Sequence, residues 1–496
     1  MSTENREEFD VVVVGGGPAG STVASLVAMQ GHRTLILERE SFPRYQIGES
    51  LLPSTVHGVC RLLGVQDELA QAGFMRKRGG TFKWGSSENP WKFAFSVSPR
   101  MAASTSFAYQ VERMKFDQIL LDNARRLGVD VRERCPVTGV IDDGGRICGV
   151  RYSDPEGNLK QAFGKYVVDA SGNTSRIHQS VGGKRQYSEF FRNLALFGYF
   201  ENGKRLSPPD SGNILSVAFK SGWFWYIPLT STLTSVGAVV RRDLAEKVQG
   251  DPEKALASLI GECPTIKEYL STATRITTGE YGKIRVRKDF SYHQTKFWDS
   301  GMTLIGDAAC FVDPVFSSGV HLATYGAVLA ARSINSTLAN LMDETVAFRE
   351  FEARYRREYG VYYEFLTAFY DMHADEKSYF WQARKVTNSS HSELEAFVDL
   401  VGGVSSGEFP LADPETLAKR FKSQSAELSS AVDTLAAQDE EDMAPLFKSS
   451  VVRQIIQETN QFQNHVLLGE DAEPDVPLFP GGLIPSSDGM FWVVPG

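Results

Sequence analysis

The sequence predicts an α/β protein in which a Rossmann-like dinucleotide-binding domain is joined to a substrate domain of mixed or antiparallel sheet and to a C-terminal helical extension. Three observations predict this fold class. A glycine-rich turn lies between an apolar strand and a helix near the N-terminus, aromatic strand-like segments occupy residues 190–278, and helical patterns dominate from residue 346. With 496 residues the chain is long enough for two or three domains.

The first element is a short apolar strand, Val11 to Val14, of the kind that is buried on both faces of a parallel sheet. Gly15, Gly17 and Gly20 follow it and fit the pattern G-x-G-x-x-G. In this pattern the first glycine permits a tight turn, the second lets a pyrophosphate approach the backbone, and the third lets the helix pack on the strand. A helix from Ala19 would direct its free N–H groups and positive dipole end at the phosphates.

The second strand, Arg33 to Leu37, ends at Glu38, about 20 residues past the glycines. A carboxylate at this place accepts hydrogen bonds from the hydroxyl groups of a ribose. The alternative is a glycine-rich turn without a ligand. The combination of strand, turn, helix and acid predicts a dinucleotide site.

Composition and charge argue against several classes of function. The formal net charge of −9 and the lack of a basic tract interleaved with aromatics argue against nucleic-acid binding. No apolar run reaches the ~18 residues of a membrane span, and the polar start MSTENREE is not a secretory signal. The five cysteines and eight histidines show neither metal-ligand spacing nor a disulfide framework, so we expect a cytoplasmic protein without a metal.

Two segments after Glu38 are open to two interpretations. Residues 41–55 predict an irregular loop before a helix, and its Arg44 is a solvated turn residue if the loop is only a connector. Residues 73–85 predict a strand pair that carries Lys77 among four basic residues. A run of charge is more often a solvated face than a site.

The next part of the chain predicts a strand, a turn and an amphipathic helix over residues 107–133. Val131 then begins a strand that we expect to meet Val140. Hairpins are predicted near residues 142–146 and 154–158.

Two further buried strands end in short turns. The strand of residues 165–170 runs into Asp169-Ala170-Ser171-Gly172, where the backbone can again approach a ligand. The strand Met302 to Ile305 ends in Gly306-Asp307.

Strand-like segments with many aromatics dominate residues 190–278, and we interpret them as the substrate domain. In Trp223-Phe224-Trp225-Tyr226-Ile227-Pro228 the period of two places Trp223, Trp225 and Ile227 on one face. One interpretation is core packing. The other is a cavity wall, because indole N–H groups need partners when they are buried.

A helix predicted from about Val320 begins after Ser317, Ser318 and Gly319. Free N–H groups and the positive dipole end point out of such a helix start, so it can hold an anion or the electron-rich edge of a reduced cofactor. The alternative is a plain serine N-cap. Beyond residue 346 we expect helices, a linker at residues 402–407, more helix at 413–465, and a last stretch of about 30 residues, rich in Pro and Gly, that wraps over another surface.

Three elements follow one another along the chain: the glycine turn with Glu38, the turn Asp169-Ala170-Ser171-Gly172, and Gly306-Asp307. In this order they resemble the flavoprotein monooxygenase superfamily, which binds FAD through one nucleotide-binding domain. The resemblance implies the fold of the aromatic hydroxylases, and Arg113 matches the arginine that contacts FAD in that superfamily. The implied FAD-binding residues are Gly15, Gly17, Ala19, Gly20, Glu38, Arg39, Arg44, Arg113, Asp169, Gly306, Asp307 and Gly319. With no second G-x-G-x-x-G, no NAD(P)H domain is implied, and a partner flavin reductase would supply reduced FAD.

Trp223, Trp225, Ile227 and Pro228 match W-x-W-x-I-P, the mark of flavin-dependent halogenases. The resemblance implies that reduced FAD and oxygen oxidise a chloride held near Ser318 and Gly319 to hypochlorous acid. It further implies that the tryptophans keep the substrate off the flavin, and that Lys77 matches the lysine that delivers chlorine to the ring. A buried ammonium can lose its proton, which suits a lysine and not an arginine.

Within the family the chain resembles most the phenol-chlorinating branch, which acts on tyrosyl or β-tyrosyl groups carried by a peptidyl carrier protein in antibiotic biosynthesis. The tryptophan halogenases have a glutamate where this chain has Phe316, in a pocket shared with Ile227 and Pro228. A phenol activates its own ring and needs no such carboxylate. An aromatic hydroxylase and a flavin-binding protein without turnover remain the alternatives.

The resemblance divides the chain into six parts. They are residues 6–86, 107–185 and 281–345 for FAD binding, 87–106 for a flap, 186–280 for the substrate sheet, and 346–496 for the helical C-terminal region.

Overall fold

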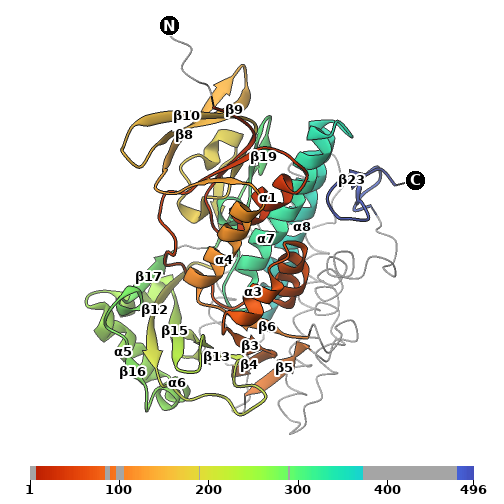
Figure 1. The fold of residues 1–496 in the computed structure, drawn as a ribbon. Coiled ribbons are helices and arrows are strands. Elements are labelled where there is room, and N and C mark those ends of the chain that lie inside the picture. The colour runs from red at the N-terminus through yellow and green to blue at the C-terminus, as the bar shows by residue number, and fades with distance from the viewer. Residues whose placement is uncertain are drawn as a thin grey trace.

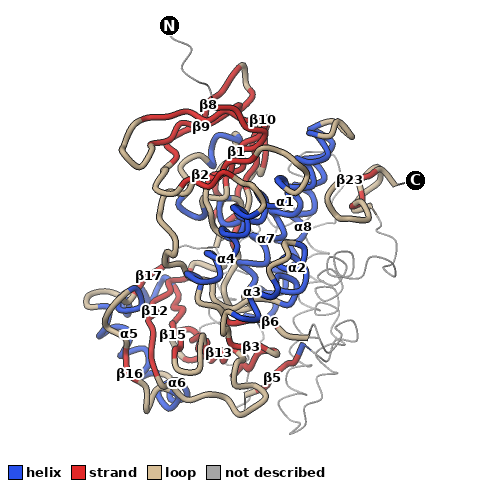
Figure 2. Tube along the Cα trace, viewed as in Figure 1, coloured by secondary structure: helices blue, strands red, loops and turns tan. Residues whose placement is uncertain are grey.

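The computed structural model describes residues 7–83, 90–95, 106–188, 190–288, 291–371 and 477–495. Figure 1 shows one large sheet at the top of the view and a second at the lower left, with the helices α7 (Ser318–Leu338) and α8 (Glu344–Asp371) standing beside them. Figure 2 shows the same division, with the strands gathered in two groups and most helices between them. The predicted α/β class is confirmed.

The first sheet has eight strands, and its path runs in the order β19-β20-β10-β1-β2-β7. The strands are β1 (Glu7–Val14), β2 (Thr34–Leu37), β7 (Asp130–Arg132), β8 (Val137–Asp143), β9 (Arg146–Ser153), β10 (Leu159–Asp169), β19 (Trp298–Asp299) and β20 (Met302–Leu304). Strands β20, β10, β1, β2 and β7 are parallel, so their carboxyl ends lie at one edge of the sheet. The apolar residues of β2, β20, the second half of β1 and the end of β10 are buried on both faces, as expected for a parallel sheet covered by helices.

Two hairpins extend this sheet as predicted, because β8 pairs with β9 and β9 with β10. The expected meeting of Val131 with Val140 is wrong. Strand β7 pairs in parallel with β2, and Val131 lies opposite Ile36. The strand after the helix α4 (Arg113–Arg126) therefore closes a crossover connection, which is what two parallel neighbouring strands require.

Helix α1 (Pro18–Ala28) packs against α7 and α4 (Arg113–Arg126) beside the central strands. The small residues of α1 permit this close packing, since ten of its residues are buried. The remaining helices are α2 (Cys60–Leu62), α3 (Gln66–Gln71), α5 (Pro252–Glu262) and α6 (Pro264–Tyr269). None of the helices in the described ranges is both long and apolar enough to cross a membrane.

The second large sheet also has eight strands, in the order β16-β12-β15-β14-β13-β4-β5, with β17 on β12. The strands are β4 (Gly79–Lys83), β5 (Trp91–Ala94), β12 (Asn193–Glu201), β13 (Ile214–Phe219), β14 (Gly222–Pro228), β15 (Leu233–Arg241), β16 (Thr274–Arg275) and β17 (Arg285–Lys288). One face of β14 packs against the nucleotide-binding part through Trp223 and Trp225. The other face packs on α5 and α6 through Phe224 and Tyr226.

Residues 73–85 do not form the predicted strand pair. Strand β3 (Met75–Lys77) pairs with β6 (Ala108–Gln110), whereas β4 pairs with β5 and β13 in the second sheet. The smaller sheets also include β11 (Arg185–Tyr187), β18 (Tyr292–Gln294) and β21 (Cys310–Phe311) in one, and β22 (Ile484–Pro485) with β23 (Trp492–Val493) in another. The predicted helix after residue 55 begins instead as a π-helical turn, Ser54–Val59.

That π-helical turn is tied to the start of α7. Ser54 Oγ is 2.9 Å from Nδ1 of His321, and Nε2 of the same imidazole is 2.6 Å from Oε1 of Glu358 on α8. All three side chains are buried. Such a network fixes the first turn of α7 relative to its neighbours.

The last described segment supports the expected wrapping of the C-terminus over another surface. Trp492 is buried, and its Nε1 donates a hydrogen bond to Ser333 Oγ on α7 at 2.8 Å. The linker predicted at residues 402–407, the helices predicted at 413–465 and most of the predicted flap lie outside the described residues.

Candidate active site

A large cavity lies where the carboxyl ends of the parallel strands meet the second sheet. The empty space within it, open solvent at its mouth included, is about 1640 Å³. Gly15, Glu38 and Asp307 line one part of it, and Trp223 and Trp225 line another. The cavity therefore joins the predicted nucleotide residues to the predicted wall.

The glycine turn opens the cavity floor. Gly15 has φ +102°, and a Cβ there would lie 2.6 Å from the carbonyl oxygen of Ala170. A Cβ on Gly20 would lie 1.8 Å from the carbonyl oxygen of Gly15, so both positions require glycine. At Gly17 a Cβ would meet only a guanidinium nitrogen of Arg44, at 3.2 Å, and otherwise faces the cavity. Helix α1 begins there without a side-chain cap, so its free N–H groups point at the space.

Glu38 lies at the end of β2 and is buried. Its Oε2 accepts a hydrogen bond from the N–H of Gly16 at 2.7 Å, and its Oε1 accepts one from the N–H of Glu40 at 2.9 Å. Each oxygen keeps a lone pair for a ribose hydroxyl. Arg39 lines the cavity and donates to Thr174 Oγ1 at 2.9 Å.

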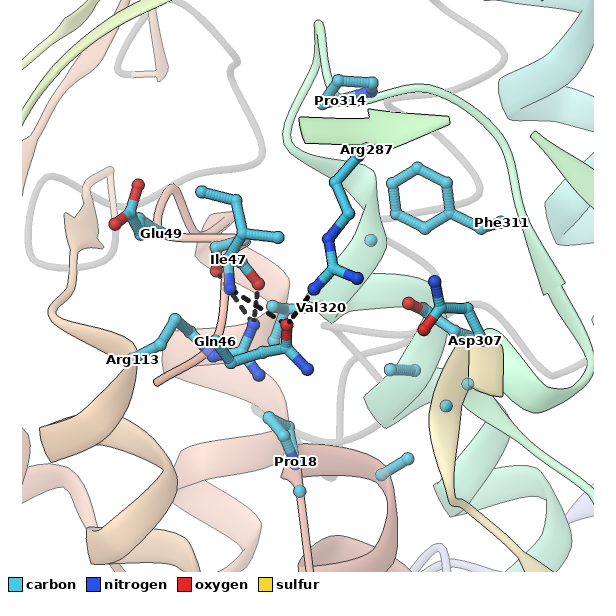
Figure 3. A pocket seen from close by; sticks show the side chains of 18 of the residues that line it. Pro18, Gln46, Ile47, Glu49, Arg113, Arg287, Asp307, Phe311, Pro314 and Val320 are labelled. Carbon is cyan, nitrogen blue, oxygen red and sulfur yellow. Dashed lines mark hydrogen bonds between the residues drawn. The ribbon is translucent and has the colours of Figure 1, made fainter. Parts of the chain in front are cut away.

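Two arginines share one carboxylate beside the cavity. Arg113 donates to both oxygens of Asp117 at 2.7 and 2.9 Å, and Arg44 donates to the same carboxylate at 2.9 Å. The side chain of Asp117 is fully buried. Because two guanidinium groups share this one carboxylate, the cluster has one net positive charge. Arg113 also donates to the carbonyl oxygens of Ile47, at 2.6 Å, and Gly48, at 3.3 Å, and thereby holds the loop of residues 41–55 (Figure 3).

The two aspartates predicted to contact the cofactor differ in orientation. Asp169 accepts hydrogen bonds from the hydroxyls of Ser171 and Ser175, at 2.6 and 2.5 Å, and does not line the cavity. It holds the turn whose backbone forms the cavity edge. Asp307 lines the cavity, where burial raises its pKa to about 6, opposed by the positive charges of Arg113 and Arg287.

The tryptophans form a rigid wall. Trp223 and Trp225 are buried, both line the cavity, and their ring centroids lie 6.1 Å apart. Nε1 of Trp225 donates to Ser235 Oγ at 3.2 Å, and a Cβ on Gly237 would lie 2.2 Å from the Trp225 ring. These two side chains therefore belong to the hydrophobic core and also form a wall of the cavity. Ile227 also lines the cavity, whereas Pro228 does not.

Lys77 differs from its basic neighbours because it is only 2% exposed, whereas Arg76 and Arg78 are exposed. Its Nζ donates to the carbonyl oxygen of Leu51 at 3.1 Å and to Ser317 Oγ at 3.3 Å. Within the described ranges it forms no ion pair with a carboxylate, and burial lowers its pKa to about 7. The solvated-face interpretation thus holds for the two arginines and fails for Lys77.

The start of α7 is not a plain serine cap. Ser317 lies at φ +63°, and its hydroxyl makes no capping bond but accepts from Lys77. Ser318 Oγ is buried without a hydrogen-bond partner among the described residues. Ser317 and Gly319 both line the cavity, which places the free N–H groups of the first turn of α7 beside it. A buried donor without a partner next to a helix N-terminus suits a small anion.

Phe316 precedes this helix start and packs on Phe82, with ring centroids 5.5 Å apart. It is partly buried and does not itself line the cavity. Because the residue is a phenylalanine, this position has no carboxylate that could accept a proton from a substrate.

A family model described as Tryptophan halogenase matches residues 10–103 and 96–436. Tryptophan 2-halogenase of Chondromyces crocatus is 31% identical over 390 residues, which make up 78% of this chain and 72% of that protein. The chain belongs to the flavin-dependent halogenase family.

Two further similarities agree with this halogenase assignment. The 1H-pyrrole-2-carbonyl-(peptidyl-carrier protein) chlorinase of Pseudomonas fluorescens is 30% identical over 387 residues, covering 73% of this chain and 84% of that protein. The structure of the myxobacterial chondrochloren halogenase CndH, described as a new variant of FAD-dependent halogenases, matches with a TM-score of 0.77 and 52% identity. That match covers 98% of this halogenase and 100% of CndH.

The residues of this halogenase fit FAD. Gly17 leaves open space at the uncapped start of α1, Glu38 keeps lone pairs at the end of β2, and the cavity continues from there to the tryptophan wall. A dinucleotide whose phosphates lie at α1 and whose ring lies at the wall suits this arrangement.

Gln46, Glu49 and Arg287 are among the cavity-lining side chains that sequence reasoning missed. Glu49 is buried, and its Oε1 accepts from Tyr199 at 2.7 Å; burial raises the pKa of Glu49 to about 7, and the hydrogen bond from Tyr199 opposes that rise. The alternation R-x-R at residues 285–287 was a signal for a strand with basic residues on one face. It contains nothing that indicates which ligand that face meets.

Proposed function

We propose that this halogenase chlorinates a phenolic ring, a tyrosyl or β-tyrosyl group tethered to a peptidyl carrier protein, using reduced FAD, oxygen and chloride. The observation that carries the proposal is Lys77, a buried lysine without a carboxylate partner in the described structure, hydrogen-bonded to the cavity residue Ser317. Similarity to a chlorinase whose name specifies a peptidyl-carrier-protein substrate supports the tethered substrate. A separate flavin reductase supplies the reduced cofactor.

When bound, reduced FAD with oxygen supplies the oxidising equivalent that converts chloride to hypochlorous acid. The free N–H groups at the start of α7, around Ser318 and Gly319, hold the chloride through their partial positive charge. Gly17, Glu38 and the start of α1 hold the dinucleotide, as their geometry supports. The net positive charge of the Arg44–Arg113–Asp117 cluster favours its phosphates.

Lys77 acts on the oxidised halogen. At a pKa of about 7 a large fraction of its amine is neutral and nucleophilic near neutral pH. The amine nitrogen attacks the chlorine of hypochlorous acid, the Cl–O bond breaks, and the lost N–H proton leaves with the hydroxide as water. The phenolic ring then attacks the chlorine of the N–Cl group, the ring loses a proton, and the amine is regenerated.

The wall of Trp223 and Trp225 decides between halogenation and hydroxylation. Both indoles are held in place, Trp225 by Ser235 and by the space that Gly237 leaves. A fixed wall keeps an organic ring away from the flavin while a small oxidant can pass. Phe316 supplies no base, and a phenol does not need one there because its own oxygen activates the ring.

The test is mass spectrometry of a carrier protein loaded with tyrosyl or β-tyrosyl and incubated with enzyme, FAD, flavin reductase, NADH and chloride. The expected product has the mass and isotope pattern of one added chlorine. Incorporation of oxygen instead would show a hydroxylase, and no turnover on any phenol, free or tethered, would support a flavin-binding protein without activity. Lys77→Arg is the matched control: guanidinium stays protonated, so the variant should bind FAD and consume oxygen but not chlorinate.

A further inference from the structure

Arg287 enters the flavin cavity from the substrate sheet and not from the nucleotide-binding domain. It lies on β17, the strand that pairs with β12, opposite Ala195, which also lines the cavity. Figure 3 shows its guanidinium group between Gln46 on one side and Asp307 on the other. The guanidinium donates a hydrogen bond to Oε1 of Gln46 at 3.2 Å.

The charge of Arg287 distinguishes it from the other arginines of this cavity. Arg44 and Arg113 are both paired with Asp117, and Arg39 lies beside Glu40. Among the described residues Arg287 forms no ion pair with a carboxylate, and the Gln46 amide that it contacts is neutral. Asp307 faces this guanidinium and interacts with its charge from beyond ion-pair distance, so a ligand that brings negative charge into direct contact with Arg287 stabilises the partly buried cation further.

We propose that Arg287 binds the negative charge of the bound flavin, so that the substrate sheet and the nucleotide-binding domain hold the cofactor together. Two groups of the same ligand can supply that charge: the pyrophosphate of FAD, or the anionic ring of the reduced flavin. Both lie within one cofactor and both pair with a guanidinium. The inference rests on the flavin dependence of the family and not on the proposed phenolic substrate, and it therefore stands or falls separately.

The same strand offers a matched control. Arg285 lies two residues before Arg287 and carries the same charge, but it does not line the cavity. Its guanidinium lies over the ring of Tyr45, 3.4 Å from the centroid, and it is 3.6 Å from a carboxylate oxygen of Glu280. Replacement of Arg285 therefore removes one positive charge from β17 without removing a cavity contact.

The experiment compares Arg287→Leu, Arg287→Lys and Arg285→Leu with the unchanged protein. The affinity for oxidised FAD is measured by flavin fluorescence at two or more salt concentrations, and the affinity for riboflavin, which lacks phosphate, is measured alongside. The midpoint potential of the bound FAD is the second readout. Neither measurement requires halogenation.

If Arg287 pairs with the pyrophosphate, Arg287→Leu should bind FAD about tenfold to a hundredfold more weakly, with a shallower salt dependence and unchanged riboflavin affinity. If it pairs with the reduced ring, oxidised FAD should bind normally and the midpoint potential should fall by about 30 mV for each tenfold loss of reduced-flavin affinity. Arg287→Lys should restore part of either effect. Arg287→Leu changing neither quantity beyond Arg285→Leu would overturn the proposal, as would a loss in Arg287→Leu that Arg287→Lys does not reduce at all.

Discussion

Replacing Lys77 with methionine tests whether this lysine is held in the interior at the expense of stability. Burial lowers the pKa of Lys77 from 10.5 to about 7. Between those two values the unfolded chain binds one more proton than the folded protein, so the free energy of unfolding rises with pH by about 1.4 kcal/mol per pH unit. Below pH 7 the whole difference, about 5 kcal/mol, opposes folding.

Methionine keeps the length of the side chain and removes its charge. We therefore expect Lys77→Met to lose this slope between about pH 7 and pH 10 and to be more stable than the unchanged protein at about pH 6. The lost hydrogen bonds to Leu51 and Ser317 offset part of the gain, by about 1–3 kcal/mol.

The assay is urea unfolding of the flavin-free proteins across this pH range, with Lys83→Met as the control. Lys83 lies on the next strand along the chain, β4, and is only partly buried, so its replacement should leave the slope unchanged. Equal slopes for Lys77→Met and the unchanged protein would show that Lys77 stays protonated in the folded state. The neutral amine required for the N–Cl step would then be absent at neutral pH.

Three further predictions concern the cofactor and the wall. Gly17→Val should lower FAD affinity by about a hundredfold or more, while circular dichroism stays unchanged because only Arg44 must move; normal affinity in a flavin titration would contradict the nucleotide site. Gly237→Ala should lower the free energy of unfolding by about 1–3 kcal/mol, because the new Cβ would lie 2.2 Å from the Trp225 ring; an unchanged thermal midpoint would show that the wall is not rigid. The purified chain should not oxidise NADH without a reductase, and rapid NADH-dependent bleaching of its flavin absorbance would refute this.

The sequence predicted best what is encoded locally. The strand β1, the glycine turn, α1 and Glu38 form one contiguous unit, and the two hairpins around β9 are likewise joined by short turns. The pairing of β7 was mispredicted because a parallel partner is distant in sequence and no turn indicates it. The tryptophan face followed correctly from the period of two in a strand.

The site was predicted less completely, because burial and pairing of charge depend on distant residues. Lys77 could not be separated from Arg76 and Arg78 by sequence, since its burial depends on contacts with Leu51 and with Ser317, which is 240 residues away. Arg287 belongs to no motif, and only the fold brings it opposite Gln46. The plain serine cap, the alternative considered for the start of α7, does not hold because Ser317 adopts a left-handed backbone and its hydroxyl accepts a hydrogen bond from Lys77.

The strand order of the first sheet has a consequence for how the protein is made. Strand β1 pairs with β2 at once, but its other neighbour, β10, begins at Leu159, and the strand that leads to Asp307 begins at Met302. At about 5–20 residues per second, a ribosome needs roughly 15–60 s to reach that strand. For that interval the apolar edge of a half-built sheet is without its native partner and is open to other chains. Production of this enzyme should therefore benefit from chaperones that cover strand edges during synthesis.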